Sequence, residues 1–158
     1  MGVFFFGGLD EERGATCEGN TVVGARQIGI GAFDLPIDSV SRNQVSQIGP
    51  TPDVDGFTLS HGIVLNEVTG LQTFRGNQFG AGVLSVGFLL QRSASPIALI
   101  VMNGRVGPDD SPGPDGCLVA QGEGLVLDEA RLAADNPDCD IDVRSDPADF
   151  LPVPMGLR

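Results

Sequence analysis

The stretch FTLSHGIVL (57–65) alternates between two kinds of residue along its length. One face of an extended strand would carry Phe57, Leu59, His61, Ile63 and Leu65, and the other would carry Thr58, Ser60, Gly62 and Val64. The first set is largely apolar, whereas the second is mostly small or polar. The stretch therefore predicts a β-strand with one buried face.

Other stretches extend this interpretation into a mainly β fold. Residues 28–32 (IGIGA) alternate apolar residues with glycine, which predicts a strand whose second face lies close to another backbone or is bare. Dipeptides that tolerate positive φ separate such runs, namely Asp55-Gly56, Thr69-Gly70, Gly76-Asn77 and Asn103-Gly104. We find no internal repeat of 20–50 residues. The pattern predicts an antiparallel sandwich or a barrel-like meander.

Two stretches are apolar on both faces when they are read as strands. They are FGAGVLSVGFLL (79–90) and IALIVM (97–102). A helix over 79–90 is disfavoured because each of its three internal glycines costs about 1 kcal/mol relative to alanine. We expect two strands that are covered on both sides, either in the centre of a sandwich or by a neighbouring subunit.

One short helix is predicted at about 128–135. Asp128 can cap it, Leu127 can pack against Leu132, and Asn136-Pro137 ends it. Pro- and Asp-rich stretches lie on both sides of this helix. We therefore expect two parts, a β-rich core domain with an apolar N-terminal segment (1–105) and an acidic, loop-rich extension (106–158).

The charge balance restricts the classes of partner. The net charge is −12, and all nine basic residues are Arg. Residues 1–105 carry six Arg and nine acids, whereas residues 106–158 carry three Arg and twelve acids. Such a field repels phosphate backbones and anionic lipids, so we expect no nucleic-acid partner. An acidic surface without Lys is typical of a salt-rich medium, and GC-biased codon usage explains the same composition.

No part of the sequence predicts insertion into a membrane or a signal peptide. Gln91-Arg92-Ser93-Ala94-Ser95 separates the longest apolar stretches, and neither reaches about 18 residues. The first six residues, MGVFFF, contain no basic n-region of the kind that a signal peptide has. They are soon followed by Asp10-Glu11-Glu12.

Candidate catalytic residues are few. His61 is the only imidazole, and a strand over 57–65 would direct Ser60 to the opposite face. A histidine among apolar neighbours is more typical of a core than of a catalytic base. A thiol of Cys17 or Cys117 could pair with His61 and an Asp, but no local motif supports that arrangement. We therefore predict no catalytic and no cofactor-binding residue.

The run DCDID (138–142) is the one candidate metal site. Asp138, Asp140 and Asp142 alternate as the first ligands of a calcium loop do. The run departs from the EF-hand pattern, which has Gly and Glu where this chain has Val143 and Asp149. The alternative, which we favour, is a solvated acidic face without any cofactor.

The three cysteines leave one thiol over if a disulfide forms. In an extracellular protein we expect a bridge between Cys117 and Cys139 with Cys17 reduced. Three buried reduced thiols are the alternative. The spacing disfavours a zinc site, because no CxxC or His-x-His pair occurs and His61 is the only imidazole.

The adjacent rings of Phe4, Phe5 and Phe6 need a partner, either the chain's own core or an adjacent subunit. Together with Leu84, Val86 and Phe88 they are the candidate interface residues.

These patterns lead to one hypothesis and one alternative for the function. The hypothesis is a non-enzymatic structural subunit, such as a virion capsid or decoration protein or a filament or surface-layer component, which self-associates through an apolar β surface. An extracellular or virion location fits it better than the cytoplasm. The alternative is a small β-sheet enzyme or ligand-binding barrel that uses His61 with Asp or Cys residues.

Overall fold

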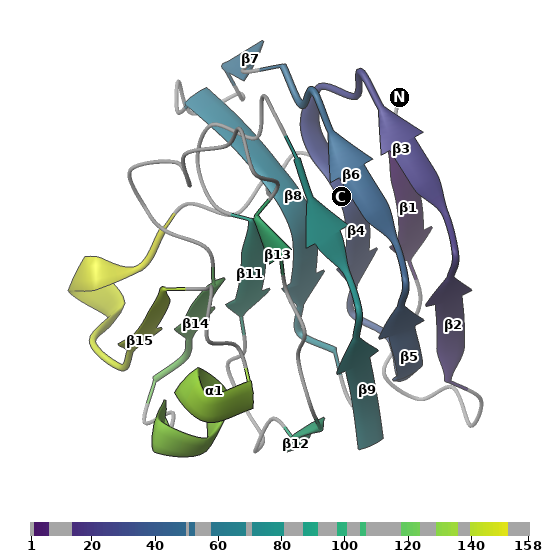
Figure 1. Ribbon diagram of the computed structural model, residues 1–158. Helices are drawn as coiled ribbons and strands as arrows, with labels where there is room; N and C mark the ends of the chain where they lie inside the picture. The colour runs from purple at the N-terminus through teal and green to yellow at the C-terminus, as the bar shows by residue number, and fades with distance from the viewer. Residues whose placement is uncertain are drawn as a thin grey trace.

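The computed structural model is built almost entirely from β-strands (Figure 1). It describes residues 2–6, 14–49, 51–52, 58–68, 71–80, 87–91, 98–100, 105–106, 118–123, 129–135 and 140–151. The mainly β prediction is confirmed. Where the structure describes a connection between strands, it usually passes from one sheet to another.

The strands form three sheets, which we name A, B and C. Sheet A contains β1 (Val3–Phe6), β4 (Gln27–Phe33), β8 (Thr58–Asn66), β11 (Phe88–Gln91), β14 (Leu118–Gln121) and β15 (Ile141–Arg144), in that order. Sheet B contains β2 (Ala15–Glu18), β5 (Ile37–Ser41), β9 (Leu71–Arg75) and β12 (Ala98–Ile100). Sheet C contains β3 (Thr21–Val23), β6 (Gln44–Ser46), β10 (Gln78–Phe79) and β13 (Arg105–Val106). A short strand, β7 (Thr51–Pro52), pairs with β8.

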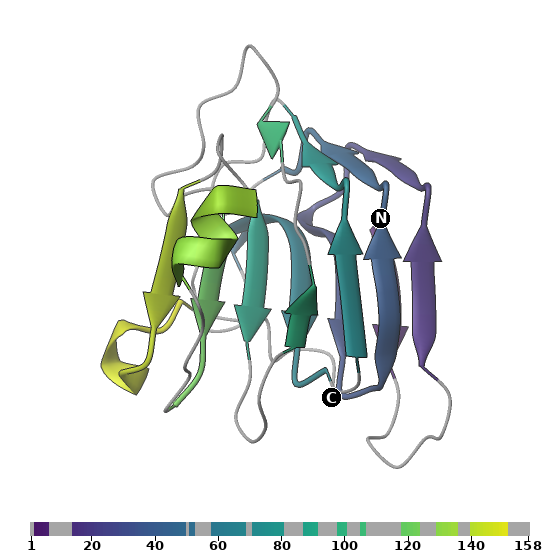
Figure 2. The same ribbon diagram turned by 60° about the horizontal axis from the view of Figure 1, so that its bottom comes forward.

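The chain visits the three sheets in turn and so winds into a parallel β-solenoid (Figures 1 and 2). One turn through sheets A, B and C is called a rung here. Rung 1 is β1, β2 and β3, rung 2 is β4, β5 and β6, rung 3 is β8, β9 and β10, and rung 4 is β11, β12 and β13. The last strands of sheet A, β14 and β15, follow rung 4.

The predicted antiparallel arrangement is wrong, because every described strand pair except β7 with β8 is parallel. Apolar residues alternate with a period of two in both kinds of sheet, so the alternation alone does not distinguish them. The turn dipeptides between the strands predict a meander. In the structure Gly76-Asn77 instead joins β9 of sheet B to β10 of sheet C.

The core lies inside the solenoid and is built from columns of residues in register. Two columns on the inner face of sheet A are Val3, Ile30, Ile63, Phe88, Leu118 and Ile141, and Ala32, Leu65, Leu90, Ala120 and Val143. Neighbouring members of a column are separated by the strand spacing of about 4.8 Å. Phe88 also packs edge-on against Phe79 of sheet C, with ring centroids 5.3 Å apart.

The outer face of sheet A is buried as well. Val64, Leu89 and Val119 lie in one column and are all 0% exposed. They belong to a second apolar cluster with Ile28 and Phe33, and Phe4 and Leu151 pack against it. The strand over 57–65 was predicted to have one buried face. That prediction is wrong for residues 60–65, because all six are buried, whichever face they lie on. A sheet between two apolar layers needs apolar residues on both faces.

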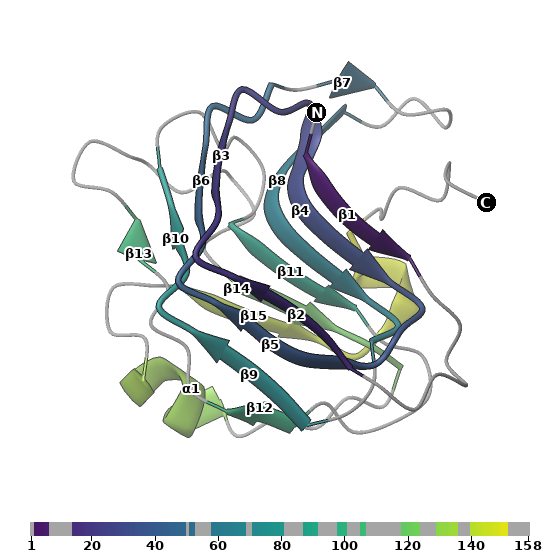
Figure 3. The ribbon, with the colours of Figure 1, turned by 90° about the vertical axis from the view of Figure 1, so that its right-hand side faces the viewer.

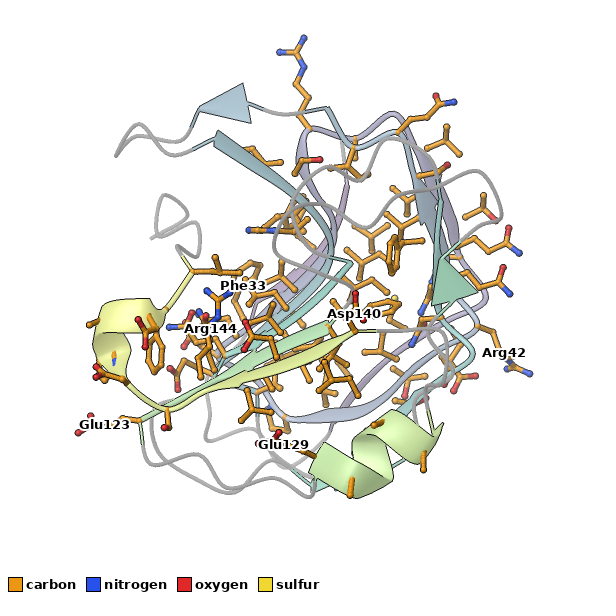
Figure 4. The ribbon with its side chains drawn as sticks, turned by 60° about the vertical axis from the view of Figure 1, so that its left-hand side comes forward. Phe33, Arg42, Glu123, Glu129, Asp140 and Arg144 are labelled. Carbon is orange, nitrogen blue, oxygen red and sulfur yellow. The ribbon has the colours of Figure 1, made fainter. Side chains whose placement is uncertain are left out.

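The segment after β15 folds back over this outer cluster. The Leu151 backbone N–H donates to Gln121 Oε1 at 2.8 Å, and Gln121 Nε2 donates to the Leu151 carbonyl at 2.8 Å. The Arg144 guanidinium donates to the Asp149 carbonyl at 2.9 Å, at the end of the short 3-10 helix η1 (Pro147–Asp149). Arg144 is labelled in Figure 4. These bonds hold Leu151 against the apolar cluster.

The doubly apolar stretch 79–90 contributes to two sheets. Phe79 ends β10 in sheet C, and Phe88 begins β11 in sheet A. Residues 81–86 lie outside the described part of the chain. Both faces of β11 are covered by the chain itself, so this strand does not need a neighbouring subunit.

The predicted helix is present as α1 (Glu129–Asp135). It lies next to β12 at the end of sheet B, as Figures 1 and 3 both show, and it contacts β15. Its predicted cap, Asp128, is outside the described residues. Because β14 and β15 continue sheet A, the boundary predicted at 105/106 passes between strands of one sheet.

Candidate interaction edge

Rung 1 ends all three sheets on the same side of the solenoid (Figure 3). Among the described residues, β1 pairs only with β4, β2 only with β5, and β3 only with β6. An end of this kind presents rows of backbone N–H and C=O groups that can pair with another strand.

The backbone bonds of β2 show which groups face outward. The N–H groups of Ala15 and Gly19 donate to the carbonyls of Pro36 and Ser41, at 2.8 and 3.0 Å. Since successive residues of a strand point their backbone groups to opposite sides, Thr16 and Glu18 direct theirs away from β5.

The same reasoning applies to β3 in sheet C. The Asn20 carbonyl accepts a bond from the Gln44 N–H at 2.8 Å, and the Gly24 N–H donates to Ser46 at 3.2 Å. Thr21 and Val23 therefore direct their backbone groups away from β6. The Val23 side chain is 58% exposed and is the only large hydrophobic side chain in the described chain that is classed as exposed.

An asparagine ladder runs through the corner between sheets B and C. It consists of Asn20, Asn43 and Asn77, one from each of rungs 1 to 3. Asn43 Oδ1 accepts from both the backbone N–H and the Nδ2 of Asn20, each at 3.0 Å. Asn77 Oδ1 accepts in the same way from Asn43, at 3.2 and 3.0 Å. Asn43 and Asn77 are fully buried, whereas Asn20 is half-buried.

The ladder also bonds to the strands that precede it. Asn43 Nδ2 donates to the Cys17 carbonyl at 3.0 Å, and Asn77 Nδ2 donates to the Val40 carbonyl at 2.8 Å. Each buried asparagine therefore joins its own rung to the rung before it. No described residue donates to Asn20 Oδ1, so the ladder stops at rung 1.

A polar cluster lies on the outside of sheet B beside this edge. Glu18 Oε1 accepts from the hydroxyls of Ser39 and Ser41, at 2.7 and 3.3 Å, and Glu18 Oε2 pairs with Arg42 at 2.9 Å. The bond from Ser39, ahead of the guanidinium of Arg42, lowers the pKa of the Glu18 carboxyl. Figure 4 shows Arg42 at the outer edge of the molecule. The cluster joins rung 1 to rung 2 at the surface.

The catalytic candidates are buried. His61 and Ser60 are each 1% exposed, and the Ser60 hydroxyl donates to the Ile48 carbonyl. Cys17 is 3% exposed and is a free thiol. Burial raises the pKa of the Cys17 thiol, although a bond from Asn20 opposes the shift. The burial of Cys17 and its raised pKa both disfavour the thiolate that a nucleophilic cysteine needs.

The candidate calcium residues are only partly described. Asp138 lies outside the described residues, and Asp140 is exposed. The Asp142 carboxylate accepts from Arg144 Nε at 2.7 Å. Among the described residues no three His, Cys, Asp or Glu side chains gather where a metal could bind.

The predicted interface residues separate into three groups. The Phe4 ring stacks on Phe33, with centroids 6.5 Å apart, and packs against the outer cluster. Phe88 is 0% exposed in the core, so it offers no surface to another subunit. The backbones of Phe5 and Phe6 belong to β1, but their side chains, like Leu84 and Val86, are outside the described part. Cys117 and Cys139, the predicted disulfide pair, are also outside it.

The sequence interpretation missed the ladder and the Glu18 cluster. A signal for the ladder exists, because Asn20, Asn43 and Asn77 each stand two residues before an inward Val or Phe. The spacing of the asparagines is 23 residues and then 34 residues, which hides the repeat from a search at a fixed period.

Neither described helix is long and apolar enough to span a membrane. The chain matches no protein-family model, no curated protein and no solved structure.

Proposed function

We propose that this protein is a non-enzymatic structural subunit that self-associates through the strand edges of rung 1. The observation that carries the proposal is that β1, β2 and β3 end their sheets together, with no described strand beyond them. Natural proteins protect exposed edges because they are templates for pairing with another chain. Three edges at one end are three such templates on one surface.

The proposal changes the surface that the sequence suggested. The sequence predicted a contact through Phe4, Phe5, Phe6, Leu84, Val86 and Phe88. Of these, Phe4 packs against the outer cluster of its own chain and Phe88 is 0% exposed. The backbone edges remain as the available surface. A virion, filament or surface-layer setting is consistent with association of this kind.

The enzyme alternative gains no support from the residues it would use. A catalytic base must reach substrate, and His61 is 1% exposed. The burial that raises the pKa of Cys17 keeps that thiol protonated.

Sedimentation velocity over a wide range of protein concentration tests the proposal. We expect species larger than the monomer, whose fraction rises with concentration and persists in high salt because backbone hydrogen bonds are not ion pairs. A monomer at every concentration would contradict the proposal.

A further inference from the structure

We infer that the partner at rung 1 is a second copy of this chain, which docks end to end about a two-fold axis and gives a closed dimer. The inference rests on the proposed function and deepens it. It follows from a difference between the two ends of the solenoid.

The end away from rung 1 is not equivalent to rung 1. There α1 lies next to β12, the last strand of sheet B (Figures 1 and 3). A helix placed over a sheet end protects it from further strand pairing. A second copy that stacked rung 1 onto this end could not continue sheet B, so head-to-tail growth is blocked at one of three sheets.

At the far end the described sheets also finish in strands, namely β15, β13 and β12, but rung 1 has no described helix beside any of its three strands. A two-fold axis across the solenoid brings rung 1 of one copy against rung 1 of the other with the strands antiparallel. Antiparallel pairing is at least as favourable as parallel pairing per residue. Because each copy uses the end at which no described helix lies beside a terminal strand, the assembly closes at two copies.

The second copy is the occupant that fits best, because it has the same outline. An isolated extended peptide could pair with β2 or β3 but could not pair with β1, β2 and β3 together. A second rung 1 presents three edges with the same spacing. It also brings a second Val23 to the contact, where the exposed side chain of this residue would be covered.

Hydrogen exchange of the full chain at low and high protein concentration tests the contact without any substitution. The amides of Thr16, Glu18, Thr21 and Val23 face away from rung 2, so we expect fast exchange in the monomer and at least about tenfold slower exchange in the dimer. The amides of Ala15 and Gly19, which already donate to rung 2, serve as internal controls and should change less.

Three lysine substitutions locate the contact by sedimentation equilibrium. Val23→Lys puts a charge on the edge strand β3, and Gln44→Lys puts the same charge on β6, one rung away in the same sheet. Ala133→Lys puts it on α1 at the other end. All three positions are exposed, so each variant should fold, which circular dichroism and Tm will verify.

We expect Val23→Lys to raise the dissociation constant of the dimer by about tenfold or more, since both copies carry the charge at the contact. The two control variants should dimerise as the unsubstituted chain does. Open-ended growth with concentration, or loss of association in both Val23→Lys and Ala133→Lys, would overturn the two-fold dimer and indicate head-to-tail stacking. Head-to-tail stacking would overturn the inference but leave the proposed function standing, because rung 1 would still be in the contact. Association with unprotected edge amides, or a monomer at every concentration, would remove both.

Discussion

Rungs 1 and 2 carry matching residues in register but have different neighbours. Cys17 pairs with Val40, Thr21 with Gln44 and Val22 with Val45, and Asn20 contacts Asn43 at the same corner. Rung 2 has a rung on each side, whereas rung 1 has a described neighbour on one side only. The comparison teaches that a residue's cost of substitution depends on its place in the stack as well as on its type.

The test with the largest expected change in stability uses proline at two matched positions of sheet C. The Gln44 N–H donates to the Asn20 carbonyl at 2.8 Å, so Gln44→Pro removes a bond between rungs and should cost about 3 kcal/mol or more. The Thr21 N–H faces away from β6, so Thr21→Pro should cost about 1 kcal/mol in the monomer. The free energy of unfolding from urea titration measures both.

Equal costs for the two prolines would contradict an open edge at β3, because Thr21 would then have a partner. The measurement needs protein concentrations at which the chain is monomeric, since pairing between copies would give Thr21 a second role.

The second test compares the inside of the asparagine ladder with its end. Asn43→Ala removes the amide that donates to the Cys17 carbonyl and to Asn77 Oδ1, both in a buried corner. It should lower the free energy of unfolding by about 3 kcal/mol. Asn20→Ala occurs at a half-buried position and should cost about 1 kcal/mol. Asn43→Asp keeps a similar shape but puts a carboxyl group in the buried corner in place of the amide, so it should be at least as costly as Asn43→Ala.

If Asn20→Ala were the more costly change, the ladder would have to continue beyond rung 1. Thermal unfolding of the three variants under one condition provides the ranking.

These residues also show how far the sequence could predict the structure. The strand over 58–66 and the helix over 129–135 were predicted well, because alternation and helix-ending signals are local. The parallel direction of neighbouring strands was not predicted. It depends on pairings between distant residues, such as Thr21 with Gln44, and the alternation of apolar residues along one strand does not encode such pairings. Rungs of unequal length kept the repeat of Asn20, Asn43 and Asn77 from appearing at one period.

The candidate site was harder to predict than the fold. A strand edge is open when no further strand pairs with it. No residue in Thr21–Val23 indicates that a partner is absent. The Glu18 cluster depends on residues about two dozen positions away that reach the same place only after one turn of the solenoid. His61, in contrast, was correctly expected among buried residues, since Leu59 and Ile63, two positions away on the same strand face, are apolar.

The third test measures how often rung 1 opens. In a chain whose other cysteines are replaced by serine, we compare thiol labelling of Cys17 with that of Val40→Cys in a Cys17→Ser background. The two positions are in register in sheet B and are 3% and 1% exposed. We expect Cys17 to label about tenfold faster, because an edge rung opens at a lower free energy than an inner one. Equal rates would indicate that rungs 1 and 2 open together.

The smallest expected effect concerns the surface link between the two rungs. The pKa of Glu18 is lowered in the folded chain, chiefly by the Ser39 hydroxyl, from an ordinary value of 4.5. A lowered pKa means that the charged carboxylate stabilises the fold above the unfolded value, and that this contribution is lost as the pH falls through the folded value. Glu18→Gln should therefore flatten the dependence of Tm on pH below about 4.5 and leave its slope near neutral pH unchanged. The effect should be small because the group is exposed to solvent.

Arg42→Gln removes the salt bridge but keeps the Ser39 bond, so it should flatten the profile less than Glu18→Gln does. If Arg42→Gln had the larger effect, the guanidinium and not the hydroxyl would be the main link between rungs 1 and 2 at this surface.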